Sequence, residues 1–254
     1  MGSFIIDSVG FSATHSMASM LRDLPNFYVT HGSRNLKEGS MIGIDDLTVA
    51  DFVSQMLEVE KTHEHCVAIH CGFNPTTIQQ EAMKNNVTFY GLCRKNTNKQ
   101  ALSCFYWAAK KFLDGEVSIG IVVAETLNRH SKSFTKLNLK PNYITALMFY
   151  SLERVVGYNL SLADHSSGLI FMEDFLAHPE KLIDLLGADQ SDNQSLEAPK
   201  TVSHKQQMSG YDFLENCEET LECLADALTF EFHGAQIKAR DVYSRITEKN
   251  ALAI

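Results

Sequence analysis

The sequence predicts an α/β protein, organised as a three-layer α/β/α sandwich with a central parallel sheet. Short apolar runs recur along the chain, and each leads through a polar turn into a segment with apolar residues at helical spacing. The 254 residues, 44% of them hydrophobic and 21% charged, are ordinary for a globular protein with a large core. Because such strand, turn and helix units wind into one sheet with helices on both faces, we expect a single domain over residues 1–254.

The first unit is a strand, a tight turn and a helix. The apolar run 4–9 ends at Gly10, and four residues at helical spacing follow: Met17, Met20, Leu21 and Leu24. A helix amino terminus presents unpaired N–H groups and the positive end of a dipole, so Thr14, His15 and Ser16 are candidates to bind a phosphate. The same pattern also fits a capped core helix. Neither Gly-Lys-Ser nor Gly-Lys-Thr occurs, so the lysine-bearing nucleoside-triphosphate loop is absent.

The second unit pairs a strand over 27–30 with a helix that opens at Thr48. Asp51 stands three residues after Thr48, which is the spacing of a capping box. The apolar residues of this predicted helix lie on one face, and they are Phe52, Val53, Met56 and Leu57.

A third strand is predicted over 66–70, and Asn74 and Pro75 then form a good helix start as cap and first residue. His70 therefore falls at the carboxyl end of a strand. Both a structural and a functional role fit a lone histidine at that position.

A zinc site is the alternative use of this region, because it is rich in zinc ligand types. The candidates are His63, His65, Cys66, His70 and Cys71. Odd and even residues of a strand face opposite sides, so these five side chains do not converge on one ion. We therefore expect no metal.

The fourth strand, over 87–93, is followed at once by Arg94 and by a helix. Thr97 and Gln100 have the spacing of a capping box for that helix, and Ser103 lies two turns into it. Parallel sheets bind ligands at the carboxyl ends of their strands, so Arg94 and Ser103 are candidates to face a ligand. An arginine in a surface loop and a serine on a polar helix face are the alternative.

The rest of the chain is predicted as follows: a helix over 143–158, a strand over 168–172 ending at Glu173 and Asp174, a short helix over 179–186 stopped by Gly187, a polar loop at about 188–209, and helices over 211–228 and 235–246. The carboxyl-terminal part is thus expected to be helical. We expect Glu173 to hold neighbouring loops together.

Composition narrows the class of protein. The formal net charge of -9 opposes non-specific nucleic-acid binding, because neutralising phosphates needs a basic surface. No apolar run approaches the roughly 20 residues that cross a bilayer, and no basic region followed by a long apolar one, typical of a secretory signal, opens the sequence. The six cysteines form no Cys-x-x-Cys pair, which favours reduced thiols in a cytoplasmic protein.

Four segments, taken in order, resemble the sulfotransferase family that uses 3'-phosphoadenosine 5'-phosphosulfate. They are Val9-Gly-Phe-Ser-Ala-Thr-His-Ser-Met, similar to the 5'-phosphosulfate loop; Val67-Ala-Ile-His-Cys-Gly-Phe-Asn-Pro, similar to the strand of the catalytic histidine; Phe89 to Tyr106, similar to the 3'-phosphate site; and Leu169 to Gly187, similar to the Tyr-Glu-Asp-Leu segment and its following helix. The resemblance spans about residues 4–187. It implies a P-loop NTPase-like sulfotransferase fold.

The resemblance also implies an activity, the transfer of a sulfonyl group from that donor to an acceptor hydroxyl or amine, leaving adenosine 3',5'-bisphosphate. His70 would be the general base, since an imidazole with a pKa near about 6.5 suits that role at neutral pH. The 5'-phosphosulfate would bind at the loop made by Ser12, Ala13, Thr14, His15 and Ser16. Arg94 and Ser103 would bind the 3'-phosphate. The acidic chain favours a small molecule or a neutral carbohydrate as acceptor, and no sequence feature indicates an oligomeric state.

Three departures from the family pattern stand out. Phe11 or Ser12 occupies the place of the lysine that contacts the 5'-phosphate and the bridging oxygen. The spacing from Arg94 to Ser103 is one residue longer than usual. The carboxyl-terminal Arg-Lys-Gly signature is missing, and Lys205 of Ser-His-Lys is a faint substitute, so leaving-group stabilisation would fall to His15 or to Lys205.

Two other functions remain open. A degenerate sulfotransferase-like fold that binds a nucleotide or a partner protein without catalysis is favoured by the missing lysine and disfavoured by the joint presence of His70, Arg94 and Ser103. The second is a P-loop-like kinase, but this chain lacks the phosphate-loop lysine that such an enzyme needs.

Overall fold

The computed structural model describes residues 2–32, 48–188 and 216–250. The chain forms two compact units. We call the first, residues 1–95, 159–201 and 246–254, the sheet unit, and the second, residues 96–158 and 202–245, the helical unit. Each is described by itself. This division does not test the expectation of a single domain, which stays a prediction.

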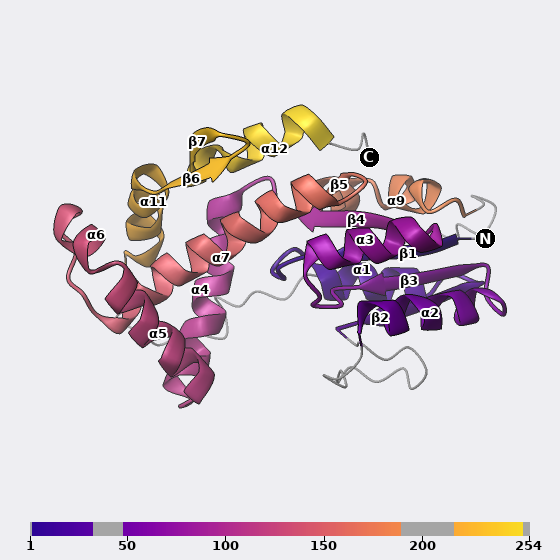
Figure 1. The fold of residues 1–254 in the computed structure, drawn as a ribbon, viewed down its shortest axis with the longest axis horizontal. Helices are drawn as coiled ribbons and strands as arrows, with labels where there is room; N and C mark the ends of the chain where they lie inside the picture. The colour runs from indigo at the N-terminus through magenta and orange to yellow at the C-terminus, as the bar shows by residue number, and fades with distance from the viewer. Residues whose placement is uncertain (1, 33–47, 189–215, 251–254) are drawn as a thin grey trace. The chain divides into compact units, whose positions relative to one another are not determined.

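The sheet unit is built on a five-stranded parallel sheet in the order β2-β3-β1-β4-β5 (Figure 1). Its strands are β1 (Gly2–Asp7), β2 (Phe27–His31), β3 (His65–Ile69), β4 (Thr88–Cys93) and β5 (Leu169–Phe171). Every neighbouring pair in it is parallel, with Ile6 of β1 opposite Ile69 on one side and Tyr90 on the other. The predicted α/β class with a central parallel sheet is confirmed.

Helices cover both faces of this sheet. They are α1 (Thr14–Arg22), α2 (Val49–Glu60), α3 (Pro75–Asn85), α8 (Met172–Ala177) and α9 (Pro179–Leu185). The chain runs from β1 through α1 toward one edge of the sheet and returns through α2 and α3, and right-handed crossovers therefore place α1 on the face opposite α2 and α3 (Figure 1). The three-layer prediction is confirmed.

On the face of the sheet that α1 covers, alternate residues of the strands form a buried apolar cluster. Ile6, Val67 and Leu92 point to the same side and pack with Leu21 of α1 and Phe175 of α8 in one buried cluster. The alternate residues of each strand point to the other face. A parallel sheet covered on both sides needs apolar residues at every position, and β3 is buried along its whole length.

The helix starts that the sequence predicted in this unit are present. The Thr48 hydroxyl accepts the N–H of Asp51 at 3.1 Å and the Asp51 carboxylate accepts the N–H of Thr48 at 3.3 Å, so the capping box of α2 is confirmed. Asn74 accepts the N–H of Thr76 at 2.9 Å, with Pro75 in the first turn of α3. Such caps satisfy N–H groups that a helix leaves unpaired.

The helical unit contains α4 (Thr97–Leu113), α5 (Val117–Arg129), α6 (Ser131–Lys136), α7 (Tyr143–His165, whose residues from Asn159 belong to the sheet unit), α11 (Cys217–Ala227), β6 (Thr229–Phe232), β7 (Ala235–Lys238), η3 (Ala239–Asp241) and α12 (Val242–Asn250, whose residues from Ile246 belong to the sheet unit). The helix predicted over 143–158 is confirmed and runs seven residues further, because no breaker stands before His165.

Two predictions in this unit are wrong. Residues 235–238 are not helical: β6 and β7 form an antiparallel hairpin with Phe232 opposite Ala235, and helical structure begins at η3. The connecting His233 and Gly234 have φ of 51° and 75°, the left-handed pair that a two-residue hairpin turn requires. The cap of α4 is Asn96, which accepts the N–H of Lys99 at 2.9 Å, and Thr97 is instead buried.

Three further predictions concern the whole chain. All six cysteines lie in the described residues and carry free thiols, with Cys223 exposed and the other five buried. Of the helices that the structure describes, none combines the length and the hydropathy that crossing a bilayer requires. The polar loop predicted at about 188–209 lies outside the described residues except for Ala188.

Candidate functional site

The carboxyl ends of β1 and β3 form the place where a ligand is expected. These strands are neighbours, and the helices that follow them, α1 and α3, lie on opposite faces of the sheet. Doubly wound sheets bind ligands in the crevice at such a switch point. The loop after β1 and His70 after β3 therefore meet here, as the sequence predicted for strand-end residues.

The loop between β1 and α1 has an unusual backbone. Gly10, Phe11 and Ala13 have φ of 92°, 62° and 56°, and left-handed residues other than glycine are strained positions that concentrate at ligand sites. Successive N–H groups in such conformations form concavities that bind anions. Ala13 is the N-cap residue of α1 and contributes no side-chain cap, so the first turn of α1 also presents N–H groups at this edge.

His70 is fastened to this loop by its ring. Its Nδ1 lies 2.7 Å from the carbonyl oxygen of Ser8, and because a carbonyl only accepts, the Nδ1 of the neutral ring carries the proton. Nε2 then keeps its lone pair and is available to accept a proton. His70 has φ of 54°, and a Cβ placed on Gly10 would lie 3.8 Å from its Cε1. The ring and the loop are neighbours.

The predicted phosphosulfate-loop residues gather around the start of α1. Ser12 is fully buried and its hydroxyl donates to the Gly10 carbonyl at 3.3 Å. Thr14 and Ser16 are buried in the first turn of α1, next to Ala13, while His15 is exposed. Their proximity to His70 follows from the fold, and a role in binding stays a prediction for each of them.

Sequence analysis missed His31, which ends β2. Its side chain is buried, its ring centroid lies 3.8 Å from that of His15 and 5.8 Å from that of His70. Neither ring nitrogen has a hydrogen-bond partner in another described residue, and only the backbone of His31 itself acts on the ring. Burial, then the charges of His15, His70 and Arg22, lower the pKa of His31 to about 3. The signal was its place at a strand's carboxyl end, the same position as His70.

A second group of charges lies at the end of β4. The Nε of Arg94 is 3.9 Å from Oε1 of Glu173, whose Oε2 accepts the backbone N–H of Lys95 at 2.9 Å. Lys95 forms an ion pair with Asp174. Burial lowers the pKa of Arg94, and Glu173 opposes that shift. Glu173 thus joins the loop after β4 to α8, as expected.

The remaining predicted residues lie elsewhere in the chain. Ser103 is in α4 of the helical unit, and its hydroxyl donates to the Lys99 carbonyl at 3.0 Å. The pairing of Ser103 with Arg94 of the sheet unit stays a prediction. Lys205 lies outside the described residues.

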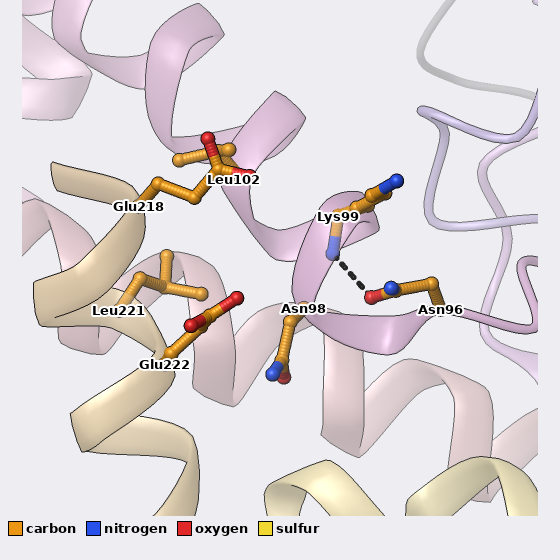
Figure 2. Close-up of a pocket in the computed structure, with 7 residues that line it drawn as sticks. All are labelled: Asn96, Asn98, Lys99, Leu102, Glu218, Leu221 and Glu222. Carbon is orange, nitrogen blue, oxygen red and sulfur yellow. Dashed lines mark hydrogen bonds between the residues drawn. The ribbon is translucent and has the colours of Figure 1, made fainter.

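A small pocket in the helical unit lies between α4 and α11 (Figure 2). Seven residues line it: Asn96, Asn98, Lys99, Leu102, Glu218, Leu221 and Glu222. Its cavity volume is about 20 Å³, far below the range of about 300–1,000 Å³ typical of small-molecule sites. Two carboxylates from one face of α11 also oppose an anionic ligand, so this pocket does not fit a nucleotide.

The histidines and cysteines around 63–71 bear on the zinc alternative. Within residues 2–32, 48–188 and 216–250, no group of three or more His, Cys, Asp or Glu side chains is arranged to hold a metal ion. The absence of a metal site therefore stays an expectation for the whole chain.

Comparisons with known proteins were made by sequence and by structure. No protein-family model matches the sequence, and a search of the curated proteins finds no match. A search of solved structures finds the mouse sulfotransferase SULT7A1 complexed with PAP, at 16% identity and a TM-score of 0.42, covering 74% of this chain and 60% of that chain. The chain thus spans less than two thirds of that protein. We base no conclusion on a likeness at this TM-score.

Proposed function

We propose that this protein is a sulfotransferase that uses 3'-phosphoadenosine 5'-phosphosulfate, with His70 as its general base. The observation that carries the proposal is the hydrogen bond from Nδ1 of His70 to the Ser8 carbonyl. It joins a histidine with an available Nε2 to a loop whose backbone suits an anion. The four sequence segments that resemble the family support the same assignment.

The residues present fit the donor at its sulfonate end. The N–H groups from Ala13 to Ser16 at the start of α1 would hold the 5'-phosphosulfate, with the Thr14 and Ser16 hydroxyls as further donors. Left-handed Gly10 and Phe11 open the loop for such contacts. What the chain lacks is the lysine of the family pattern, since Phe11 and Ser12 stand at its place.

At the other end of the donor, Arg94 would contact the 3'-phosphate through charge-assisted hydrogen bonds, with Ser103 as the second contact that the resemblance implies. Arg94 already faces Glu173 at 3.9 Å. An arginine has five N–H donors, so a phosphate and Glu173 can share it.

The chemistry follows from these assignments. The donor supplies the sulfonyl group, which passes to the acceptor oxygen or nitrogen in line with the departing 5'-phosphate. Nε2 of His70 removes the acceptor's proton while the hydrogen bond to Ser8 keeps the imidazole in the tautomer that this step needs. Backbone N–H groups of the loop stabilise charge that builds on the leaving oxygen. The residues orient the reactants and neutralise charge, as in phosphoryl transfer.

The acceptor that fits best is a small molecule or a neutral carbohydrate. With 22 basic against 31 acidic residues, the chain does not favour gripping a long anionic glycan. The free thiols, five of them buried, fit a reducing compartment such as the cytoplasm.

Thermal-shift titration with adenosine 3',5'-bisphosphate tests the proposal. A ligand that binds only the folded state raises the melting temperature, so we expect a saturable rise, and a much smaller one with adenosine 5'-monophosphate, which lacks the 3'-phosphate. No shift at millimolar bisphosphate would refute the sulfotransferase assignment. A shift with ATP and Mg²⁺ but none with the bisphosphate would indicate a kinase. Binding without transfer from the sulfonate donor to any acceptor class would favour the non-catalytic alternative.

A further inference from the structure

His31 is buried without a hydrogen-bond partner in any other described residue. Its side chain is 5% exposed, and the one hydrogen bond that acts on its ring comes from its own backbone. Buried polar groups are nearly always paired, and an unpaired one is costly in a low-dielectric interior. Such a group at a ligand edge indicates a partner that arrives with the ligand.

The surroundings of His31 indicate the charge of that partner. The groups whose charges bear on it are His15 and Arg22 of α1 and His70 after β3, all three basic. The ring of His31 lies 3.8 Å from that of His15, the second residue of α1, and 5.8 Å from that of His70. Basic groups thus lie near His31 on α1 and at the end of β3. The amino terminus of α1, a helix of nine residues, lies at the same edge of the sheet.

We propose that His31 donates a hydrogen bond to the anion bound by the loop between β1 and α1. In the family, a lysine makes this kind of contact, and Phe11 and Ser12 stand at its position here. His31 would supply the missing contact from the end of β2. This inference rests on the proposed function, because it takes the anion to be the 5'-phosphosulfate end of the donor or the 5'-phosphate of the product. The same loop and the start of α1 complete that site.

His31 makes this contact as a neutral imidazole. Burial and the three basic neighbours lower its pKa to about 3, so it carries one N–H and one lone pair at neutral pH. Since no other described residue engages either nitrogen, one ring nitrogen can carry the proton toward the ligand. A neutral donor contributes without the Coulomb repulsion that a charged one would meet from His15 and Arg22.

Calorimetric titration with adenosine 3',5'-bisphosphate tests the inference on His31→Phe and His31→Gln. Phe keeps the ring contact with His15 and removes both nitrogens, whereas Gln restores an N–H donor. We expect roughly 10- to 100-fold weaker binding by His31→Phe, the effect of losing a hydrogen bond to a charged group, and partial recovery in His31→Gln. His63→Phe, a histidine packed edge-on against Tyr28, is the matched control and should bind like the original chain.

Denaturant unfolding of the same variants separates a ligand contact from a structural role. His31→Phe removes two unpaired nitrogens, so its midpoint should be unchanged or higher while its affinity falls. If Phe is not accommodated, His31→Leu serves in the same comparison. The affinity ratio between the original chain and His31→Phe should also stay constant from pH 6 to pH 8.

Four results would overturn the inference. Equal affinity of the original chain and His31→Phe would refute it and leave the proposed function standing. A loss of affinity that follows a loss of stability, with no recovery in His31→Gln, would make His31 structural, and a ratio that grows as pH falls would refute the neutral donor. No binding of the bisphosphate by the original chain would refute the proposed function together with this assignment.

Discussion

Two places along the carboxyl edge of the same sheet carry basic side chains, and they differ in what faces those side chains. At the ends of β1, β2 and β3, the groups acting on His31 are all basic. At the end of β4, Arg94 faces Glu173 and Lys95 is paired with Asp174. At the first place the groups whose charges act on His31 are basic, and at the second each basic side chain faces a carboxylate.

The difference bears on how each place can bind an anion. At the β1 to β3 end, the proposed anion would meet the N–H groups of the loop and the buried His31 imidazole, which no other described residue engages. At the β4 end, a phosphate must share Arg94 with a carboxylate that also holds the Lys95 N–H at 2.9 Å. We therefore expect catalysis to depend chiefly on the first place, and the second to contribute affinity that Glu173 moderates.

The largest effect is expected from His70→Ala. Removal of a positioned general base costs roughly 10²- to 10⁴-fold in rate, so sulfonyl transfer should fall by that factor. Affinity for the bisphosphate should change little, because the proposed role of His70 is to take the acceptor's proton and not to bind the nucleotide. Steady-state rates and calorimetric titration of the same preparation measure both quantities.

His63→Ala, outside the candidate site, is the control for that measurement and should transfer at the original rate. A large loss of bisphosphate affinity in His70→Ala would mean that His70 holds the ligand or the loop. That result would also contradict the expectation that catalysis depends on the place at the ends of β1 to β3 while the place at the end of β4 contributes affinity.

A smaller effect is expected at the β4 end. Arg94→Ala should weaken bisphosphate binding by roughly 10- to 100-fold, as the loss of a charge-assisted contact does. Glu173→Gln should instead strengthen binding a few-fold, since it keeps an acceptor for the Lys95 N–H and removes the charge that competes for Arg94. Titration with adenosine 5'-monophosphate, which lacks the 3'-phosphate, should show neither change. Equal affinities for all three chains would exclude Arg94 from the site.

The sequence was sufficient for the sheet because its signals are local and agree with one another. Strand-length apolar runs, the Thr48 and Asp51 capping box, and the Asn74 and Pro75 helix start each predict a boundary that the structure confirms. Repetition of these units then leaves a parallel sheet with helices on both faces as the arrangement that buries every strand.

The sequence was insufficient where tertiary contacts decide between local alternatives. Thr97 and Asn96 can both cap a helix, and burial of Thr97 leaves the role to Asn96. His233-Gly234 is a weak hairpin signal, and only its left-handed backbone identifies the turn. His31 and His70 end different strands, so their 5.8 Å ring separation depends on strand order, which periodicity does not contain.

An effect of about 2 kcal/mol is expected in the pH dependence of folding stability. The pKa of His31 is about 3 in the folded protein and near 6.5 in the unfolded chain, so below pH 6.5 the unfolded chain binds a proton that the folded one does not. Stability is therefore complete above pH 6.5 and is lost as pH falls toward 3. From pH 6.5 to 5, the original chain should lose about 2 kcal/mol more than His31→Phe.

Denaturant unfolding of both chains across that pH range measures this difference, and carboxylates that titrate in both chains cancel in the comparison. Parallel curves for the two chains would mean that His31 is protonated as easily in the folded protein as in the unfolded one. Burial of His31 as a neutral imidazole beside basic groups, on which the contrast between the two places depends, would then be wrong.

The smallest effect is expected from Gly10→Ala, which tests the backbone of the loop. At φ of 92°, a Cβ would meet only Cε1 of His70 at 3.8 Å, an ordinary contact, so the cost is conformational and amounts to roughly 1–2 kcal/mol of unfolding free energy. Gly157→Ala, in the exposed part of α7 with nothing within 4 Å of its Cβ, should instead stabilise by about 0.5–1 kcal/mol. If the left-handed turn at Gly10 shapes the anion site, Gly10→Ala should also weaken bisphosphate binding, and Gly157→Ala should not. A destabilised Gly10→Ala with unchanged affinity would separate the fold of the loop from its proposed use.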